Sequence, residues 1–390
     1  MRTKRGPVVV LLAFAFALVA AGAAHAAWTI ETVDSIDNVG LFSSLALDFH
    51  TGSPRISYYD QTNKALKYAS YDGTSWTTQT VATGRVGTHT SLALNCDGSP
   101  GISYYDYPNQ ALKYSTYNGS TWITQTVDSG ANVGEHTSLV IDALGRPYIG
   151  YYDRTHSTLK YATYNGTSWA TQTVDTVGTY ELCTSRTNIS LKLDLNGKPS
   201  IAYHNENSGT LQYAHWNGST WDIQIADNSA HVGAHALLVM VGGSDPFIAY
   251  RDGTNWTLKF AKLVAGLWQT ETVDAIDDAG YDTSLAVDSL GRPRISYLAG
   301  GPADLRLASR GVAGWNIETV DSSGVVGLFT SIALDPTTGD PRISYYDSTN
   351  GDLKFAYQGA LVVPEPATLA LLAAGAAAAV AARRRAPPHA

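Results

Sequence analysis

Polar residues able to bind a ligand recur at one position of a repeated pattern. His89, His136 and His235 each stand just before a short β-rich run, and Asp282 has the same place in a later copy. Imidazole and carboxylate groups exchange hydrogen bonds with sugar hydroxyls, and histidine also binds zinc. The full set at this position is Phe42, His89, His136, Asn188, His235, Asp282 and Phe329. We expect these residues to form a polar and aromatic ligand-binding face.

A second position ends the phrase "PRISYYD", which occupies residues 54–60 and again 341–347. In most copies the first tyrosine is predicted to pack between repeats, because buried aromatic rings contribute large apolar areas. The aspartate is predicted to accept amide hydrogens from the following turn. The phrase breaks down at His204, at Arg251 and at Leu298. Because those breaks occur in consecutive repeats, we add His204 and Arg251 to the candidate face.

Motifs for catalysis are absent from the sequence. There is no G-x-S-x-G, H-E-x-x-H, P-loop or EF-hand pattern. We therefore assign no catalytic residue and no cofactor. A pair of carboxylates remains open, because a glycosidase needs only two acids roughly 5–10 Å apart; the residues to consider are Asp282, Asp106 and Asp153.

A metal site is not expected either. His89, His136 and His235 come from separate repeats, and a ring of repeats spreads equivalent residues around its axis. Zinc requires ligands that converge at about 2.0–2.1 Å. Hydrogen bonding to the neighbouring repeat explains such histidines without a metal.

The elements that must position these residues repeat seven times. Each unit begins at a tryptophan, with spacings of 48, 46, 47, 52, 47 and 47 residues, and the anchors are Trp28, Trp76, Trp122, Trp169, Trp221, Trp268 and Trp315. Each unit contains four short β-rich runs separated by Gly, Pro, Asn and Asp turns. This predicts an all-β fold, a single seven-bladed β-propeller of four-stranded blades over residues 27–360. Residues 28–33 precede the first complete blade, so we expect them to close the ring as the outer strand of the last blade.

The opposite face of the ring is predicted to carry other residues. Arg55, Arg294 and Arg342 share the start of one strand, and we interpret them as isolated surface arginines. Cys96 belongs to a turn on that face, whereas Cys183 lies in the lengthened connection on the candidate face. We therefore expect no disulfide between them.

The two ends of the chain are typical of export. Residues 1–26 combine basic residues, an apolar stretch and an A-x-A site, which predicts a signal peptide. Residues 361–390 contain an uncharged Ala/Leu-rich stretch at 367–382, predicted as a transmembrane helix, followed by Arg383, Arg384 and Arg385. At 1.5 Å per residue this helix is about 24 Å long, short for a hydrocarbon core of about 30 Å.

Pro364, Glu365 and Pro366, then the apolar stretch and the arginines, resemble the PEP-CTERM sorting signal of Gram-negative bacteria that produce exopolysaccharide. The resemblance implies a transient inner-membrane anchor, processing by an exosortase-type sorting protease, and delivery to the cell surface or extracellular matrix. Such tails are also labelled ice-binding protein C-terminal domain. That label refers to the sorting signal and does not indicate ice binding.

The net charge of the chain limits the classes of partner that it can bind. The formal net charge is −8 and the positive charges form no stripe, so nucleic acid is excluded as a partner. We hypothesise a non-catalytic surface protein that binds an exopolysaccharide, another glycan or a surface protein. The alternatives are a secreted polysaccharide hydrolase or lyase, and a purely structural matrix component.

Overall fold

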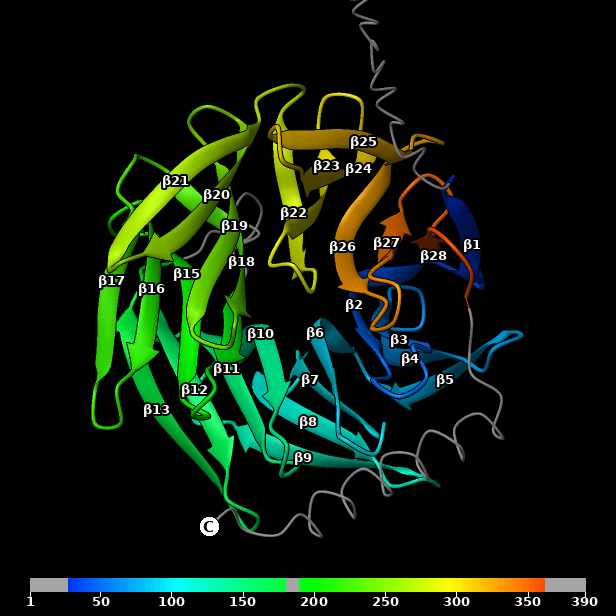
Figure 1. Cartoon of the computed structure of the whole chain (residues 1–390). Coiled ribbons are helices and arrows are strands. Elements are labelled where there is room, and N and C mark those ends of the chain that lie inside the picture. Colours follow the sequence, from blue (N-terminus) through cyan, green and yellow to red (C-terminus); the bar gives the residue numbers. More distant parts are fainter. Residues whose placement is uncertain (1–26, 180–188, 362–390) are drawn as a thin grey trace, which may run out of the picture.

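The four strand patterns of each repeat form one antiparallel sheet, and seven such sheets are arranged in a ring (Figure 1). Their inner strands line a central channel. The computed structural model describes residues 27–179 and 189–361. The predicted seven-bladed propeller of four-stranded blades is confirmed. We number the blades 1 to 7 in chain order and letter the strands a to d from the channel outward.

The strands at each level of the ring have similar bounds. The inner strands a are β2 (Val39–Leu47), β6 (Val86–Leu94), β10 (Val133–Ile141), β14 (Ser190–Leu193), β18 (Val232–Val241), β22 (Ala279–Val287) and β26 (Val326–Leu334). The strands b are β3 (Pro54–Asp60), β7 (Pro100–Asp106), β11 (Pro147–Asp153), β15 (Pro199–Asn205), β19 (Asp245–Asp252), β23 (Pro293–Ala299) and β27 (Pro341–Asp347). The strands c are β4 (Ala65–Tyr71), β8 (Ala111–Tyr117), β12 (Thr158–Tyr164), β16 (Thr210–Trp216), β20 (Thr257–Val264), β24 (Asp304–Arg310) and β28 (Asp352–Tyr357). The outer strands d are β5 (Trp76–Ala82), β9 (Trp122–Asp128), β13 (Trp169–Thr176), β17 (Trp221–Asp227), β21 (Leu267–Asp274), β25 (Trp315–Asp321) and β1 (Thr29–Asp34).

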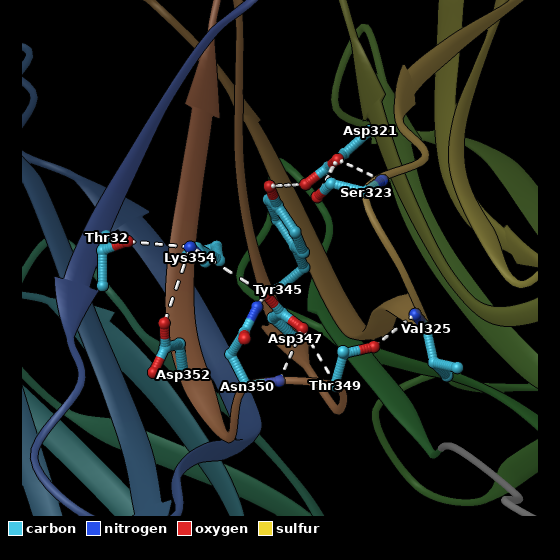
Figure 2. Close-up of polar contacts among 10 residues, drawn as sticks. All are labelled: Thr32, Asp321, Ser323, Val325, Tyr345, Asp347, Thr349, Asn350, Asp352 and Lys354. Carbon is cyan, nitrogen blue, oxygen red and sulfur yellow. Dashed lines mark hydrogen bonds and ion pairs between the residues drawn. The ribbon is translucent and has the colours of Figure 1, made fainter.

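The ring is closed by its first strand. β1 pairs antiparallel with β28, with Thr29 opposite Tyr357, and completes blade 7 (Figure 1). Lys354 of β28 donates to Thr32 Oγ1 of β1 across this joint at 2.8 Å (Figure 2). The expected closure by residues 28–33 is therefore confirmed, and it leaves neither end of the ring as an unpaired sheet edge.

The core lies at the seams between blades and not in a single centre. Each of the seven seams has its own apolar cluster; in the seam between blades 7 and 1, Ile56 and Tyr58 pack against Leu353 and Phe355. The first tyrosine of the Tyr-Tyr-Asp phrase is fully buried there, as predicted. Seven similar seams explain why seven similar sequences are needed.

A buried polar contact accompanies that tyrosine. The Tyr58 hydroxyl donates to Asp34 at the end of the preceding strand d, at 2.6 Å, and Lys67 also contacts Asp34. The same tyrosine–aspartate contact, 2.6–2.8 Å long, joins Tyr151 to Asp128, Tyr203 to Asp175, Tyr250 to Asp227, Tyr297 to Asp274 and Tyr345 to Asp321 (Figure 2). The exception is Tyr104, where Ala82 replaces the aspartate and the hydroxyl contacts Ser115 Oγ at 3.2 Å.

The aspartate that ends the phrase has the predicted local role. Asp347 accepts the backbone N–H groups of Thr349 and Asn350 at 3.0 and 3.1 Å and so holds the turn between strands b and c (Figure 2). Asp106 and Asp153 hold the corresponding turns through Asn109 and His156. These carboxylates stabilise the scaffold.

In six blades, all except blade 4, the inner strand starts with a distortion of its backbone. In blade 2, Gly87 has φ +105°, and a Cβ there would lie 2.6 Å from Leu66 Cβ of the previous blade, so only glycine fits. His89 follows with φ 54°, and the pairing of β6 with β7 shifts register on both sides of Thr88. The candidate residues were expected just before the inner strands; the six that the structure describes lie instead inside them, at a bulge.

The expected signal peptide at 1–26, the expected helix at 367–382 and Cys183 lie outside the described residues. Within residues 27–179 and 189–361 there is no helix long and apolar enough to cross a membrane.

Candidate functional site

The candidate site is the mouth of the central channel on the face that carries the d-to-a and b-to-c connections. A cavity of about 240 Å³ opens there, and all seven inner strands line it. Of the residues selected from sequence, His89, His136 and Asp282 line this cavity directly, together with Phe42 and Phe329. Asn188 lies outside the described residues.

Six mouth residues share a left-handed backbone, with φ between 47° and 55°: Phe42, His89, His136, His235, Asp282 and Phe329. This region costs a residue with a Cβ about 1–2 kcal/mol, and it is rare for bulky side chains such as phenylalanine. Such strain tends to gather at functional sites. Five of these residues, Phe42, His89, His136, Asp282 and Phe329, line the cavity.

Four of these side chains form a continuous arc of rings. The ring centroids are 4.6 Å apart between Phe329 and Phe42, 4.8 Å between Phe42 and His89, and 4.5 Å between His89 and His136. The arc therefore crosses blades 7, 1, 2 and 3, which are contiguous only because the ring is closed.

A tyrosine from the end of strand b supports each ring of the arc. Tyr105 lies 6.5 Å from His89, and its hydroxyl donates to Asn132 of the next blade at 2.7 Å. Tyr346 lies 6.4 Å from Phe329 and donates to Asn38 at 2.8 Å. These bonds fix the second tyrosine of the phrase behind the mouth.

The two histidines of the arc are held neutral. Burial lowers the pKa of His89 to about 4, opposed by Glu135 and reinforced by Arg154. Burial also lowers the pKa of His136 well below its ordinary value, and the nearby basic groups His89, Arg154 and His235 act in the same direction. A neutral imidazole offers one donor and one acceptor, as a sugar hydroxyl does.

On the other side of the mouth, Asp282 lies beside His235. Nδ1 of His235 accepts the Asp282 backbone N–H at 3.1 Å, and the same nitrogen lies 3.3 Å from a carboxylate oxygen of Asp282. The second carboxylate oxygen of Asp282 accepts the Phe329 N–H at 2.8 Å. Blades 5, 6 and 7 are thereby linked through their mouth residues.

The three histidines do not form a metal centre within residues 27–179 and 189–361, where no group of three or more His, Cys, Asp or Glu side chains is arranged to hold a metal ion. His89 and His136 are neighbours in the arc, whereas His235 is paired with Asp282 across the mouth. Asp106 and Asp153, the other carboxylates considered, do not line the cavity.

His204 and Arg251 lie behind the mouth and connect blades. His204 contacts Val232 O at 2.7 Å through Nδ1 and Glu206 at 2.6 Å through Nε2. His204 and Arg251 are both buried, and each occupies the position of the second tyrosine of the phrase.

Arg251 makes the corresponding contact to blade 6. Its guanidinium donates to Asp278 at 2.6 Å and to the Tyr281 hydroxyl at 3.0 Å, and it lies 3.9 Å from the centre of that ring. Where His204 or Arg251 replaces the second tyrosine, it makes its own contact with the next blade in place of the tyrosine's contact.

The opposite face departs from the sequence prediction at one residue. Arg342 is 0% exposed, so its description as an isolated surface arginine is wrong. It donates to Ala360 O at 3.0 Å and to Asp335 at 3.1 Å, and it also contacts Gln358 O. The guanidinium is buried because the end of the last blade folds over it. Cys96, on the same face, is exposed and forms no disulfide within the described ranges.

Two features of the channel wall were missed in the sequence. One is a ring of serines that line the cavity below the mouth. Each stands at the start of an inner-strand phrase that reads "SLALD" at residues 44–48 in blade 1. The other is Lys192, which replaces the alanine of that phrase and also lines the cavity. The sequence carries a signal for it, because this repeat position is alanine or valine in the other six blades.

Comparisons with known proteins identify the tail and the fold. Residues 362–385 match the PEP-CTERM protein-sorting motif. No curated protein matches the chain.

Several solved structures are similar. A PL25 polysaccharide lyase, an ulvan lyase, superposes with a TM-score of 0.59 at 13% identity, covering 87% of this chain and 99% of that one. The fucose-specific lectin from Aleuria aurantia has a TM-score of 0.52 at 14% identity, covering 75% of this chain and 97% of that one. A protein of unknown function from Dyadobacter fermentans has a TM-score of 0.50 at 12% identity, covering 86% and 98%. At these identities the likeness shows the fold alone; the chain is a seven-bladed β-propeller followed by a PEP-CTERM protein-sorting motif.

Proposed function

We propose that this exported propeller binds a glycan, without catalysis, at the mouth of its channel. The observation that carries the proposal is the arc formed by Phe329, Phe42, His89 and His136, which faces the Asp282 carboxylate across one cavity. At about 240 Å³ the cavity is slightly below the range of about 300–1,000 Å³ typical of small-molecule sites, so it suits a single sugar residue or chain end.

The chemistry of the mouth fits a carbohydrate on both sides. Aromatic rings pack against the apolar C–H face of a sugar, and neutral imidazoles and a carboxylate exchange hydrogen bonds with its hydroxyls. The left-handed backbone holds these groups in place before binding, which reduces the ordering cost of association. His204 and Arg251 act in this proposal as braces of the mouth, through Val232 and Asp278.

The destination of the protein supports a glycan partner. The PEP-CTERM motif indicates export and a membrane-anchored sorting step. We propose that an exosortase-type protease then processes the tail, and that the propeller reaches the cell surface or matrix, where exopolysaccharide is available. Carbohydrate-active relatives of the fold, a fucose-specific lectin and a polysaccharide lyase, support this choice by analogy only.

A glycan array tests the proposal. We expect the full-length chain to bind at least one glycan class, and the double variant His89→Ala/His136→Ala to lose that binding by about tenfold or more. The variant His50→Ala is the control, because His50 is exposed on a turn between strands a and b, on the opposite face. Absence of binding across glycan and matrix panels would contradict the proposal, and self-assembly of the unliganded protein would then favour a structural role.

A hydrolase or lyase is the second candidate, and the His235–Asp282 pair at the mouth is the observation that favours it. A carboxylate next to an imidazole is an arrangement used for proton transfer. Turnover of a polysaccharide that disappears in Asp282→Asn, while binding persists, would replace the non-catalytic proposal by this one.

A further inference from the structure

Below the mouth, serine side chains form a collar around the channel. Their Oγ atoms each accept a backbone N–H from the inner strand of the next blade at 2.9–3.0 Å. The members of this serine collar are Ser44, Ser91, Ser138, Ser190, Ser284 and Ser331. Leu237 takes the place of serine in blade 5.

The collar can present O–H donors to the channel. Each hydroxyl has one hydrogen, and each oxygen already uses one of its two lone pairs to accept a backbone N–H. Among residues 27–179 and 189–361 no acceptor receives the collar hydroxyl hydrogens, and all six serines line the cavity. A ring of unused O–H donors attracts a group that is rich in acceptors, above all an anion.

A positive charge lies next to the collar. Lys192 follows Ser190 by two residues, so it lies on the same side of β14, about 7 Å farther along the strand. The equivalent residues of the other blades are Ala46, Ala93, Val140, Val239, Ala286 and Ala333. Lys192 alone among these seven lines the cavity.

The Lys192 ammonium makes no ion pair or hydrogen bond with any residue in the described ranges of the chain. Burial lowers the pKa of Lys192. An ammonium that is buried without a partner is destabilised, and an anion that reaches it restores the lost interaction.

We propose that the serine collar and Lys192 bind an anionic group, the carboxylate or sulfate of an acidic saccharide whose sugar ring lies at the mouth. The inference rests on the proposed function and adds the ligand class. Asp282 fits the same ligand, because its carboxylate accepts sugar hydroxyls at the mouth and repels a second anion there. In this arrangement the anionic group of the ligand lies near Lys192, and its sugar hydroxyls lie near Asp282.

Titration calorimetry of the full-length chain with three probes tests this assignment: glucose, glucuronate and inorganic sulfate. Glucose and glucuronate differ by the carboxylate alone. We expect glucuronate to bind at least about tenfold more tightly than glucose, which is the size of one charge-assisted hydrogen bond. Sulfate tests the collar without a sugar.

The variant Lys192→Ala removes the charge and introduces the residue found at this position in four other blades. We expect it to weaken glucuronate binding by about tenfold and to leave glucose binding unchanged. Lys198→Ala is the matched control. Lys198 is on the same blade but does not line the cavity, and it donates to Asn217 O in the turn between strands c and d.

The outcomes separate the two proposals. Equal affinity for glucose and glucuronate, or unchanged glucuronate binding in Lys192→Ala, overturns the anion site. Neither result contradicts glycan binding at the mouth. Sulfate binding that depends on Lys192, with no glycan bound on the array, supports the anion site and overturns the glycan proposal. Absence of binding by all three probes overturns the anion site, and absence of binding on the array as well overturns both.

Discussion

His89 illustrates how one residue serves both packing and recognition. Its ring lies between Phe42 and His136 in the arc, and its backbone carbonyl accepts the Thr137 hydroxyl of the next blade at 2.8 Å. The residue is therefore held from both sides in a left-handed conformation. Phenylalanine occupies the same position with the same backbone in blades 1 and 7, at Phe42 and Phe329.

The lowered pKa of His89 makes a prediction about acid. In the unfolded chain histidine titrates near 6.5, whereas the folded protein holds His89 neutral down to about 4. The stability contributed by neutral His89 is thus fully present above about pH 6.5 and is lost as the pH falls toward 4. Replacement by phenylalanine removes this titration, so His89→Phe should lose less stability than the native protein between pH 7 and pH 5.

Urea unfolding of the two proteins at both pH values measures this difference. His136 remains in both proteins, and burial, the main cause of its lowered pKa, contributes to both curves. Identical losses of stability on acidification would contradict the assignment of a low pKa to His89.

At the scale of the strand, the seams have a repeated tyrosine–aspartate contact with one natural gap. An aspartate near the end of strand d accepts the buried tyrosine of the next blade, as Asp128 accepts Tyr151 at 2.7 Å, and in that seam Lys160 also donates to Asp128 at 2.5 Å. Blade 1 ends instead in Ala82, while Tyr104 and Lys113 remain. Ser115 supplies the missing partner, at a position where alanine is found in the other six blades.

This gap predicts a stabilising substitution. Ala82→Asp should complete the contact with Tyr104 and Lys113 and raise the free energy of unfolding by about 1 kcal/mol, the net value of a buried hydrogen bond. Ser115→Ala should destabilise the native protein and have little effect once Ala82→Asp is present. A double-mutant cycle followed by urea unfolding checks the coupling, and strictly additive effects would refute it.

At the scale of the whole molecule, the ring depends on eight residues at its start. β1 provides the outer edge of blade 7 and also places Asp34 under Tyr58 and Lys67 of blade 1. Removing residues 27–34 should expose the edge of β28 and leave two buried polar groups of blade 1 without a partner.

We expect a chain that begins at Ser35 to self-associate and to unfold at a lower temperature than a chain that begins at Ala27. Size-exclusion chromatography with light scattering and thermal unfolding by circular dichroism measure both effects. A monomeric truncated protein with an unchanged unfolding temperature would show that the seam between blades 7 and 1 holds without β1.

Much of the fold was predictable because it is local information repeated. Tryptophan spacing, turn residues and alternating strands are properties of short segments, and seven copies of them determine a ring and its closing strand. The mouth residues were predictable for the same reason, since they share one place in the repeat. The bulge that aims them was not identified, although the glycine two residues before most of them, such as Gly87, is its sequence signal.

The sequence by itself determined the number of blades, the closing strand, the sorting motif and the ring of candidate residues. The tertiary structure alone decided which of them meet: Phe329 contacts Phe42 across the closure, His204 and Arg251 are used in seams, and Arg342 is buried. It also placed Lys192 beside a serine collar built from six blades. The physical reason is that residues about 47 positions apart in the chain become neighbours only around a shared axis, where burial and unused hydrogen-bond donors are properties of the whole ring.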